Sequence, residues 1–548
     1  LIREARAFKL ERVVEDEGCS PYADPAIMAD SVDTFLKQRA KLHKLPLKRS
    51  KKGWNHTYLG LFGHAEVPVD LEGVYACRDI GHTLALDRAQ RHRAMGCGTW
   101  YEPQRQSLYA NEMLLVRALA DMEYAGQRVD VHYLERLAAY LDQELEVRGR
   151  ELETLFRCRI DWNNDNKLRS LLYDRLRFPV YNRTPRGLPS VDRGTLMSLR
   201  QHHPGMEALA EWRARFKVRS AYTLSLANIT GRDGRIHTSF NQWGTATGRL
   251  SSSDPNLQNV PSRHKELARL VRLAFPVDEG RARVYADYSQ IELRVLAWAT
   301  GSRVLTEAYQ SAAYDSWLRG EIDYEGYRRA RAGEPSVDVH GLVCSRLFGI
   351  EKGHVEWDRK RKATKIVNFG VPYGGGHALL SGSPELRLPE VEAKAFHAQY
   401  HEQNPEIAYT RDRLLAQMLE DPDLSFVNWA GRVRHGPRLD WRDDDARSEE
   451  ERSMFASMIQ GGAGELTRFS IVRLYLLQQQ GLMPGRSTST VHDEVQVDCD
   501  VPDIREAALA TQREMENYQG AFGSIPVVAD LETSVTTWAD KKDWSEAA

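Results

Sequence analysis

The sequence predicts an α+β protein of several domains. Its 548 residues are too many for one hydrophobic core, so separate or shared cores are expected. Apolar residues recur at spacings of three and four in 114–122 and 134–152, the pattern of long amphipathic helices. Residues 489–500 instead alternate apolar and polar side chains, the pattern of a strand. Helices and strands thus occupy different stretches of the chain, which is typical of the α+β class.

Composition places the chain among globular proteins and leaves its ligands open. Hydrophobic residues make up 42% and charged residues 28% of the sequence. A net charge of −2 excludes a uniformly basic nucleic-acid coat, but it allows a basic cleft balanced by acidic surfaces elsewhere. Six cysteines without a CxxC pair favour a reducing compartment. The sequence has no apolar run of membrane length and no recognisable signal peptide, so a cytoplasmic location is expected, at the nucleoid or in a phage-infected cell.

Four stretches are conspicuous for their polarity. The basic run 37–52 is expected to be a solvated loop rather than a DNA-binding patch. The charged stretches 311–336 and 440–452 are both expected to form solvated surface, the first of them as a helical insertion. Residues 231–261 are rich in Gly, Ser, Asn and Thr, which predicts short strands and loops of the kind that often carry function.

Asp287 ends an apolar segment, VYAD, that predicts a buried strand. A helix is expected to begin near Ser289. A carboxylate at the end of a buried strand can project into a cleft, but it can also serve only as the N-cap of the helix that follows. The residues of this segment alone leave both interpretations open.

A second group of carboxylates lies at a predicted hairpin. The segment STVHDEVQVDCD at 489–500 indicates a half-buried strand preceded by a shorter one, with its polar face formed by Gln496, Asp498 and Asp500. His492, Asp493 and Glu494 then fall at the hairpin tip. Carboxylates on adjacent strands can hold a pair of divalent cations, which prefer oxygen ligands and suit in-line phosphoryl transfer.

A stripe of four residues spaced by four is predicted on one helix: Arg361, Lys365, Phe369 and Tyr373. Two cations at one end suit a triphosphate, and two aromatic rings at the other suit a base and a sugar. The alternative is a surface helix with two core aromatics, which periodicity does not exclude. The glycines and the proline in 370–376 end or kink this helix, as expected of an element that moves.

These segments together resemble family A DNA polymerases, the group of bacterial DNA polymerase I and many phage enzymes. DYSQIELR at 287–294, RKATKIVNFGVPYG at 361–374 and VHDE at 491–494 are similar to the three polymerase motifs of that family. TATGRLSSSDPNLQNVP at 245–261 and QGGAGE at 460–465 resemble further stretches. Five motifs in the same order are far more specific than any one of them.

The resemblance implies a right-hand polymerase with a palm of antiparallel sheet and helical fingers and thumb, preceded by part of an α/β RNase H-like exonuclease domain. It divides the chain into the C-terminal part of the 3′–5′ exonuclease-like domain (1–100), the thumb (101–240), the first part of the palm (241–300), the fingers (301–420) and the second part of the palm (421–548).

The resemblance also implies a metal site. Asp287 and Asp493 are expected to ligate two Mg²⁺ ions, for which Mn²⁺ can substitute, with help from the carbonyl of Tyr288 and with Glu494 nearby. The primer 3′-hydroxyl would then attack the α-phosphorus of the incoming nucleotide. Lys365 is expected to contact the triphosphate and to protonate the departing pyrophosphate.

The incoming deoxynucleotide is expected to meet side chains from several motifs: Arg361, Lys365, Phe369, Tyr373, His340, Gln290 and Glu292. Glu292 and Tyr373 are expected to leave no space for a ribose 2′-hydroxyl, so deoxynucleotides are the expected substrates. Phe369 lacks a hydroxyl, which implies discrimination against dideoxynucleotides that Phe369→Tyr would reduce.

Contacts with DNA follow from the same resemblance. Minor-groove donors can sense base-pair geometry without reading base identity, and the residues expected near the primer terminus are Arg249, Asn256, Gln258, Gln460 and His492. The sequence departs from the family pattern at Ala456, where an asparagine often contacts the template, so that contact is in doubt. Phosphate contacts are expected from Asn166, Lys167 and Lys217.

The segment YACRDIGHT at 75–83 resembles the third motif of the family's 3′–5′ proofreading exonuclease, with Tyr75 and Asp79 in matching positions. The two carboxylate motifs that should precede it do not occur in the right order. Because the sequence begins at Leu1 rather than Met, we expect the chain to start inside this domain, and decay of the domain is the alternative. Proofreading by this chain is not expected.

Three rival classes of protein fit the sequence less well. A two-metal nuclease could use the same carboxylates, but it has no need of the cationic and aromatic stripe. A DNA-binding protein without catalysis has no need of Asp287, Asp493 and Lys365 together, and Glu292 argues against a single-subunit RNA polymerase. The expected partners are primer-template DNA, deoxynucleoside triphosphates and an unidentified processivity or replication partner, with the chain itself a monomer.

Overall fold

The computed structural model describes residues 49–50, 53–54, 103–184, 186–261, 264–335, 337–381, 388–420, 425–435 and 444–544. The chain divides into two compact units, Leu1–Tyr109 and Ala110–Ala548. In the first unit, β1 (Arg49–Ser50) and β2 (Gly53–Trp54) form an antiparallel pair. Tyr75, Asp79 and the rest of the expected exonuclease portion, 1–100, lie outside the described residues, apart from this pair of strands.

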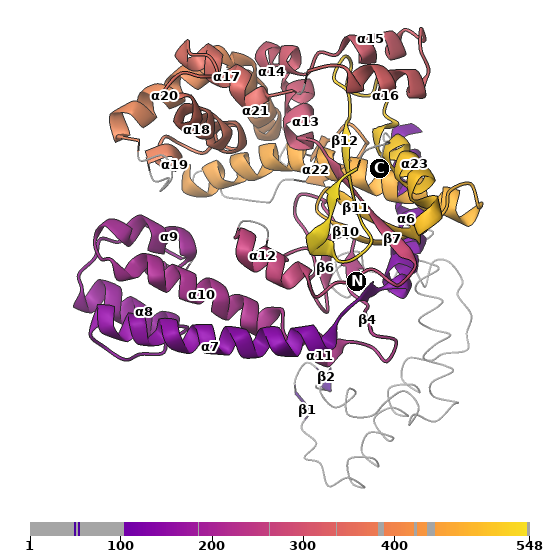
Figure 1. Cartoon of the computed structure of the whole chain (residues 1–548). Coiled ribbons are helices and arrows are strands. Elements are labelled where there is room, and N and C mark those ends of the chain that lie inside the picture. Colours follow the sequence, from indigo (N-terminus) through magenta and orange to yellow (C-terminus); the bar gives the residue numbers. More distant parts are fainter. Residues whose placement is uncertain are drawn as a thin grey trace. The chain divides into compact units, whose positions relative to one another are not determined.

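A five-stranded antiparallel sheet lies at the centre of the second unit (Figure 1). Its strands, in spatial order, are β10 (Arg486–Val491), β11 (Glu494–Asp500), β7 (Arg281–Tyr288), β12 (Ala529–Ser534) and β13 (Lys542–Asp543). The middle strand β7 is buried along almost its whole length because β11 and β12 pair with it on both sides. Its end therefore lies between two other strands.

Three helices share the hydrophobic core of this sheet: α6 (Pro103–Ala125), α22 (Asp444–Gln479) and α23 (Ile504–Glu516). The predicted helical segment 114–122 is thereby confirmed as part of α6. The charged stretch 440–452 lies partly outside the described residues, and its remainder begins α22.

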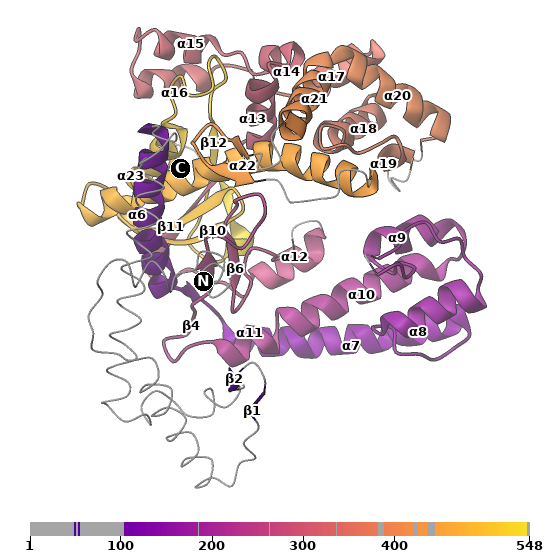
Figure 2. The ribbon, with the colours of Figure 1, turned by 180° about the vertical axis from the view of Figure 1, so that it is seen from behind.

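A helical arm extends from the sheet, with its long helices α7 (Val131–Phe156) and α10 (Gly205–Ala221) side by side (Figures 1 and 2). It also contains α8 (Asp165–Arg169), a π-helix (Ser170–Arg175), α9 (Arg193–Ser198), a 3-10 turn (Leu199–Gln201) and α11 (Leu224–Ile229). The arm has a core of its own, and a second core joins its base to β7 through residues such as Phe275, Tyr285 and Trp538. Predicted helix 134–152 is confirmed within α7.

Short strands and one helix connect the arm to the sheet. They are β3 (Gln127–Arg128), β4 (Arg235–Ile236), β5 (Ser239–Asn241), β6 (Ser251–Ser253) and α12 (Lys265–Arg272). β3 pairs with β4, and β5 pairs with β6. The prediction of short strands and loops in 231–261 is confirmed.

A second helical group follows the strand β7. It comprises α13 (Ile291–Thr300), α14 (Arg303–Ala308), α15 (Ala312–Leu318), α16 (Tyr324–Ala332), α17 (Val339–Phe348), α18 (Trp357–Gly370), α19 (Ala378–Ser381), α20 (Glu390–Gln403) and α21 (Pro405–Glu420). The hairpin of β8 (Ser425–Val427) and β9 (Val433–His435) returns the chain to α22. A 3-10 turn (Val501–Asp503) precedes α23, and another (Trp538–Asp540) follows β12.

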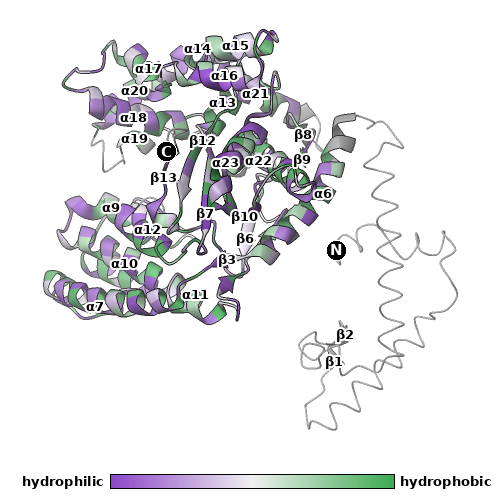
Figure 3. Ribbon diagram, turned by 45° about the vertical axis from the view of Figure 1, so that its right-hand side comes forward, coloured by the Kyte–Doolittle hydropathy of each residue, from purple (hydrophilic) through white to green (hydrophobic). Residues whose placement is uncertain are grey.

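The helices carry alternating hydrophilic and hydrophobic bands (Figure 3), as expected for helices with one face on a core. No helix in the described part of the chain has the length and the apolar content needed to cross a bilayer.

The expectation of a purely solvated surface at 311–336 is wrong. α15 and α16 form a hairpin around a small aromatic core in which Tyr314, Trp317 and Tyr327 are buried. The ring of Trp317 stacks on that of Tyr327 at a centroid distance of 4.9 Å. The sequence predicted solvated surface because charged residues lie between these aromatic residues. In the fold, the aromatic rings point inward and the charged groups point outward.

Candidate active site

Asp287 lies near the end of β7, and the strand pairing brings other acidic residues next to it. Glu494 is its partner on β11, and Asp530 is its partner on β12. Asp493 adjoins them, since its carbonyl accepts a hydrogen bond from the backbone N–H of Tyr288 at 3.4 Å. Desolvation and the charges of Glu494 and Asp493 raise the pKa of Asp287 to about 7. The site therefore concentrates negative charge.

The helix after β7 begins at Ile291, with Gln290 at its N-cap position in the left-handed region (φ 53°). Asp287 is three residues upstream of that position, so the alternative that it merely caps the helix is wrong. The ring and hydroxyl of Tyr288 are buried, with the hydroxyl 2.8 Å from Ser470 Oγ. Only the backbone of Tyr288 is thus available to a ligand at the site.

Asp493 and His492 form the two-residue turn between β10 and β11, which confirms the predicted hairpin tip. Burial raises the pKa of Asp493, and the positive charge of Arg249 acts against this rise. Arg249 Nη2 lies 3.3 Å from both carboxylate oxygens of Asp493 and 2.6 Å from Glu292 Oε1. This one guanidinium therefore links a hairpin carboxylate to the helix that follows Asp287.

Glu494 differs from Asp493, whose two oxygens share the single donor Arg249 Nη2, because each of its carboxylate oxygens has a donor of its own. Oε1 accepts from Gln496 Nε2 at 2.8 Å, and Oε2 accepts from Lys541 Nζ at 2.7 Å. Lys541 also pairs with Glu532. Protein side chains thus fix the orientation of the Glu494 carboxylate, whereas a metal ligand without such donors could rotate toward a cation.

The carboxylates of the site can supply only some of the ligands that a divalent cation needs. Among the described residues, no three His, Cys, Asp or Glu side chains are arranged as a complete metal-binding group. Asp287 and Asp493 nevertheless supply hard oxygen donors, and the mutual repulsion at Asp287 would be relieved by a cation. Mg²⁺ commonly uses one or two carboxylates and takes its other ligands from water and substrate phosphates. The two aspartates fit a cation shared with a phosphate substrate.

Glu292 and Tyr373 are brought together as predicted. The Tyr373 hydroxyl donates to Glu292 Oε2 at 2.7 Å, while Arg249 donates to the other oxygen. Tyr373 lies beyond Gly370, the last residue of α18, so the expectation that it belongs to the same helix as Arg361 is wrong. The glycine and proline after Phe369 end the helix before Tyr373.

The other three members of the predicted stripe lie on α18. Lys365 and Phe369 are exposed, so the alternative of two core aromatics is wrong for Phe369. The Arg361 guanidinium forms a bidentate ion pair with Asp338, with Nε–Oδ2 and Nη2–Oδ1 both at 2.8 Å. Asp338 was not predicted, although its position as the N-cap of α17 is a recognisable signal.

His340 is buried beside this stripe. Its Nδ1 lies 3.0 Å from Asn368 Nδ2, and its ring is 5.6 Å from that of Phe369. Burial and the positive charges of Lys365 and Arg361 lower the pKa of His340 to about 4. The imidazole is therefore neutral at neutral pH, so it can donate a hydrogen bond to a phosphate but brings no positive charge.

The remaining predicted residues are less closely grouped. Gln290 Oε1 accepts from the Tyr309 hydroxyl at 3.2 Å. Asn256 is exposed, and Gln460 is half-buried on α22. Gln258 is buried, and its Nε2 has no hydrogen-bond partner within the described part of the chain.

The residues expected to contact phosphates lie on the arm. Asn166 and Lys167 are in α8, where their backbone N–H groups are capped by Asn164, and Lys217 is exposed on α10.

Sequence reasoning missed Asp530, Lys541 and Gln127, which borders Gln496. None of the three lies in a recognisable motif. Only the pairing of β12 with β7, the return of the C-terminal segment and the position of β3 bring them to the carboxylates.

An antiparallel sheet with carboxylates at one strand end, followed by a helix with cationic and aromatic side chains, defines a polymerase-like protein. Residues 131–540 match the family model described as "DNA polymerase family A", and the chain belongs to this family. Family A polymerases use divalent metal ions, which agrees with the donors found here.

Curated relatives agree with this assignment. The chain is 34% identical over 440 residues to a thermostable DNA polymerase I of Thermus thermophilus, covering 80% of this chain and 48% of that protein. It is 30% identical over 441 residues to a DNA polymerase I of Lactococcus lactis subsp. lactis, covering 80% and 46%. The chain thus spans about half the length of these relatives.

A solved structure is also similar. It is the POL domain of Pol1 from M. smegmatis in complex with a DNA primer-template and a dNTP. The TM-score is 0.67 at 28% sequence identity, and the match covers 78% of this chain and 70% of that one. The expected fold is therefore confirmed as that of a family A polymerase domain, mostly helical with an antiparallel sheet.

Proposed function

We propose that this chain is a DNA-directed DNA polymerase, which adds deoxynucleotides to a primer 3′-hydroxyl as a template directs and releases pyrophosphate. The observation that carries the proposal is the placement of Asp287 near the end of β7 beside Asp493, which lies in the turn that enters the neighbouring strand β11. Primer-template DNA and deoxynucleoside triphosphates are the proposed partners, with the chain acting as a monomer. A processivity or replication partner stays a prediction.

Asp287 and Asp493 would hold the two Mg²⁺ ions, with Mn²⁺ as a substitute, and the Tyr288 carbonyl would assist. Such ions, when bound, supply charge neutralisation for the phosphoryl group and lower the pKa of the attacking hydroxyl. The chain's own contribution is to fix one carboxylate on β7 and the other in the adjoining β10–β11 turn, and to surround them with fixed charges. Positioning and electrostatics carry most of phosphoryl transfer, since little covalent chemistry is required.

The α18 stripe would bind the triphosphate. Arg361 and Lys365 carry the positive charges, and His340 offers a neutral donor because its pKa is about 4. Arg361 forms a bidentate ion pair with Asp338, so its guanidinium group is oriented before a substrate binds. Phe369 is free to stack on a base, and Gln290 lies at the start of the neighbouring helix.

Lys365 is further proposed to protonate the leaving pyrophosphate. Lys365→Ala should then slow the bond-forming step measured in single turnover. A variant with weaker nucleotide binding and an unchanged single-turnover rate would contradict this role.

DNA contacts are proposed for Arg249, Asn256, Gln258, Gln460 and His492. Gln258 supports this, because an orphan amide donor in a buried position gains a partner when a base edge reaches it. Arg249 is more constrained than expected, since it already bridges Asp493 and Glu292. Binding of DNA at Arg249 would redistribute these ion pairs.

Proofreading is proposed to be absent, because two of the three exonuclease motifs do not occur in order in the sequence. Incubation of the protein with Mg²⁺ and a mispaired primer should leave the 3′ nucleotide in place. Its removal by wild-type protein, with loss of that removal in Asp79→Ala, would overturn this proposal.

Primer extension with deoxynucleotides and Mg²⁺ tests the main proposal. Asp287→Asn and Asp493→Asn should each lower the single-turnover rate by about a thousandfold or more, since each removes a charge essential to transition-state stabilisation. Asp500→Asn is the matched control: Asp500 is exposed at the far end of β11, where it pairs with Arg281, and the variant should stay near wild type. Tight DNA binding without any extension by wild type would instead support a DNA-binding protein.

A further inference from the structure

Glu494 receives one of its two hydrogen bonds from a buried amide. Gln496 lies two residues further along β11, is fully inaccessible to solvent and donates from Nε2 to Glu494 Oε1 at 2.8 Å. A half-buried strand was expected here, with Gln496 and Asp498 on a polar outer face. That expectation is wrong, because both residues are buried.

A residue far away in the sequence covers this face. Gln127, on β3 at the base of α7, donates from Nε2 to Gln496 Oε1 at 2.9 Å, across 369 positions of sequence. Gln127 Oε1 in turn accepts from Arg283 Nη1 at 3.2 Å. Arg283 is fully buried on β7 and forms a bidentate pair with Asp498.

The two charged ends fix the direction of this chain of hydrogen bonds. An arginine can only donate and an ionised carboxylate can only accept. Gln127 must therefore turn its oxygen to Arg283 and its nitrogen to Gln496. Gln496 must then turn its oxygen to Gln127 and its nitrogen to Glu494. Neither amide can be reversed without breaking a contact at one end.

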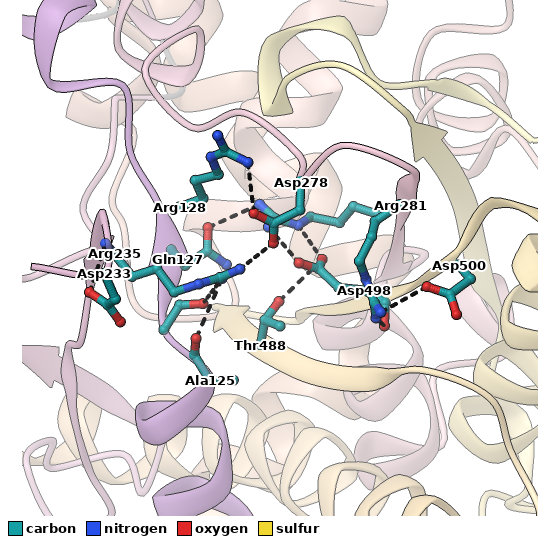
Figure 4. A network of polar contacts seen from close by, with 12 residues as sticks. Ala125, Gln127, Arg128, Asp233, Arg235, Asp278, Arg281, Thr488, Asp498 and Asp500 are labelled. Carbon is teal, nitrogen blue, oxygen red and sulfur yellow. Dashed lines mark hydrogen bonds and ion pairs between the residues drawn. The ribbon is translucent and has the colours of Figure 1, made fainter. Parts of the chain in front are cut away.

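The base of the arm is tied to the same part of the sheet. β3 pairs with β4, and the adjacent Arg128 and Arg235 both bind the carboxylate of Asp278, which precedes β7 (Figure 4). Gln127 therefore cannot shift without moving the entry to the strand that carries Asp287. Thr488 touches Asp498 at 3.5 Å and lies outside the chain from Arg283 to Glu494.

We infer that Gln127 and Gln496 are positioning residues of the active site, which hold the Glu494 carboxylate in a fixed place opposite Asp287. The inference rests on the proposed polymerase function. Lys541 holds the second oxygen, so Glu494 is a fixed negative charge beside the metal-binding aspartates rather than a ligand free to rotate. The base of the helical arm thus forms part of the support of the catalytic carboxylates.

Two variants interrupt the chain in different ways. Gln496→Met removes the donor to Glu494. Gln127→Glu keeps an acceptor for Arg283 but forces Gln496 to donate toward residue 127, so its oxygen faces Glu494. Each should lower the single-turnover incorporation rate by about tenfold, with little change in dNTP or DNA affinity, as loss of a residue that orients a metal-site carboxylate does. Thr488→Val is the control and should match wild type.

A double-mutant cycle separates positioning from general damage. If Gln496 acts through Glu494, Gln496→Met should cost no further rate in a Glu494→Gln background. An equal loss in both backgrounds, or wild-type rates for Gln496→Met and Gln127→Glu, would overturn the inference. Poor folding of one variant still leaves the other to decide the outcome.

A readout without catalysis distinguishes this inference from the proposed function. Urea unfolding of Gln127→Met, Glu494→Gln and the double variant should show midpoint shifts that are not additive, because one chain of hydrogen bonds connects the two residues. Additive shifts would count against the chain even in an active polymerase. Failure of the wild type to extend a primer would count only against the proposed function.

Discussion

At the scale of single residues, two cations determine how much negative charge the site leaves uncompensated. Arg249 spans Asp493 and Glu292, and Lys541 spans Glu494 and Glu532. No such donor is found for Asp287 within the described residues, and burial together with the charges of Glu494 and Asp493 raises its pKa to about 7. A cation bound next to Asp287, as proposed above, would relieve this unfavourable burial and repulsion of its negative charge.

Glu292 and Tyr373 are expected to decide the choice of sugar. Their hydrogen bond of 2.7 Å holds the Glu292 carboxylate against Tyr373, and we propose that the length of the Glu292 side chain excludes a ribose 2′-hydroxyl. Glu292→Ala should raise ribonucleotide incorporation relative to deoxynucleotide incorporation by about tenfold or more, the range expected when a small steric block is removed. Competing incorporation of the two nucleotides, measured in single turnover, checks this.

Glu292→Gln is the matched control for that variant. It keeps the size of the side chain and should retain most of the sugar discrimination. Unchanged discrimination against ribonucleotides in Glu292→Ala would show that other residues exclude the 2′-hydroxyl.

At the scale of elements, the α15–α16 hairpin is fixed to α23 through a buried carboxylate. Glu516 accepts from Tyr324 Oη at 3.0 Å, from Arg331 Nη1 at 2.7 Å and from the backbone N–H of Ala529 at 2.9 Å. Ala529 begins β12 opposite Tyr288. The hairpin thereby supports the strand that flanks Asp287, a role beyond surface decoration.

Removal of Arg331 should therefore destabilise the protein. Arg331→Met leaves Glu516 buried without a counter-charge, and breaking a buried pair in this way costs about 3–5 kcal/mol. Urea unfolding measures this loss, and the double variant Arg331→Met/Glu516→Gln should recover much of it, since an amide needs no cation. Arg319→Met, at an exposed pair with Glu321, should leave the urea midpoint close to that of wild type, because solvent screens such a pair. Equal effects at both sites would contradict the argument.

At the scale of the whole second unit, the joint between the arm and the sheet depends on charge. Arg128 and Arg235 from β3 and β4 meet at Asp278 before β7. Burial acts to raise the pKa of Asp278, but the hydrogen bonds and charges of Arg235 and Arg128 outweigh it and lower that pKa. A depressed carboxyl pKa stabilises the folded state above the unfolded value of about 3.9 and ceases to do so as pH falls through the folded value.

The contribution of Asp278 should therefore disappear in acid. Asp278→Asn should unfold at a lower temperature than wild type at pH 7, and the difference should shrink as pH falls below about 4. Thermal unfolding followed across this pH range measures the difference. A difference in unfolding temperature that stays constant down to about pH 2, well below the unfolded pKa, would show that Asp278 acts through its shape rather than its charge.

Local patterns in the sequence determined much of the site. An apolar run ending in Asp287, the alternation beyond Glu494 and the spacing of Arg361, Lys365 and Phe369 each predicted an element that the structure contains. These predictions succeeded because strand and helix periodicity depends on neighbours within a few residues. The pairing of Glu292 with Tyr373 followed from resemblance to the family, and the structure has it.

Only the tertiary structure decided which polar residues are buried and what holds them. In the sequence, Gln496 and Asp498 look like the solvent-exposed face of a strand, yet both are buried. Gln127 on β3, hundreds of residues earlier, packs against this face and hydrogen-bonds to Gln496. Lys541 reaches Glu494 from the far end of the chain, and Trp317 is buried within a charged insertion. Contacts of this range leave no trace in local periodicity, because burial depends on what packs against a face and not on the residues beside it.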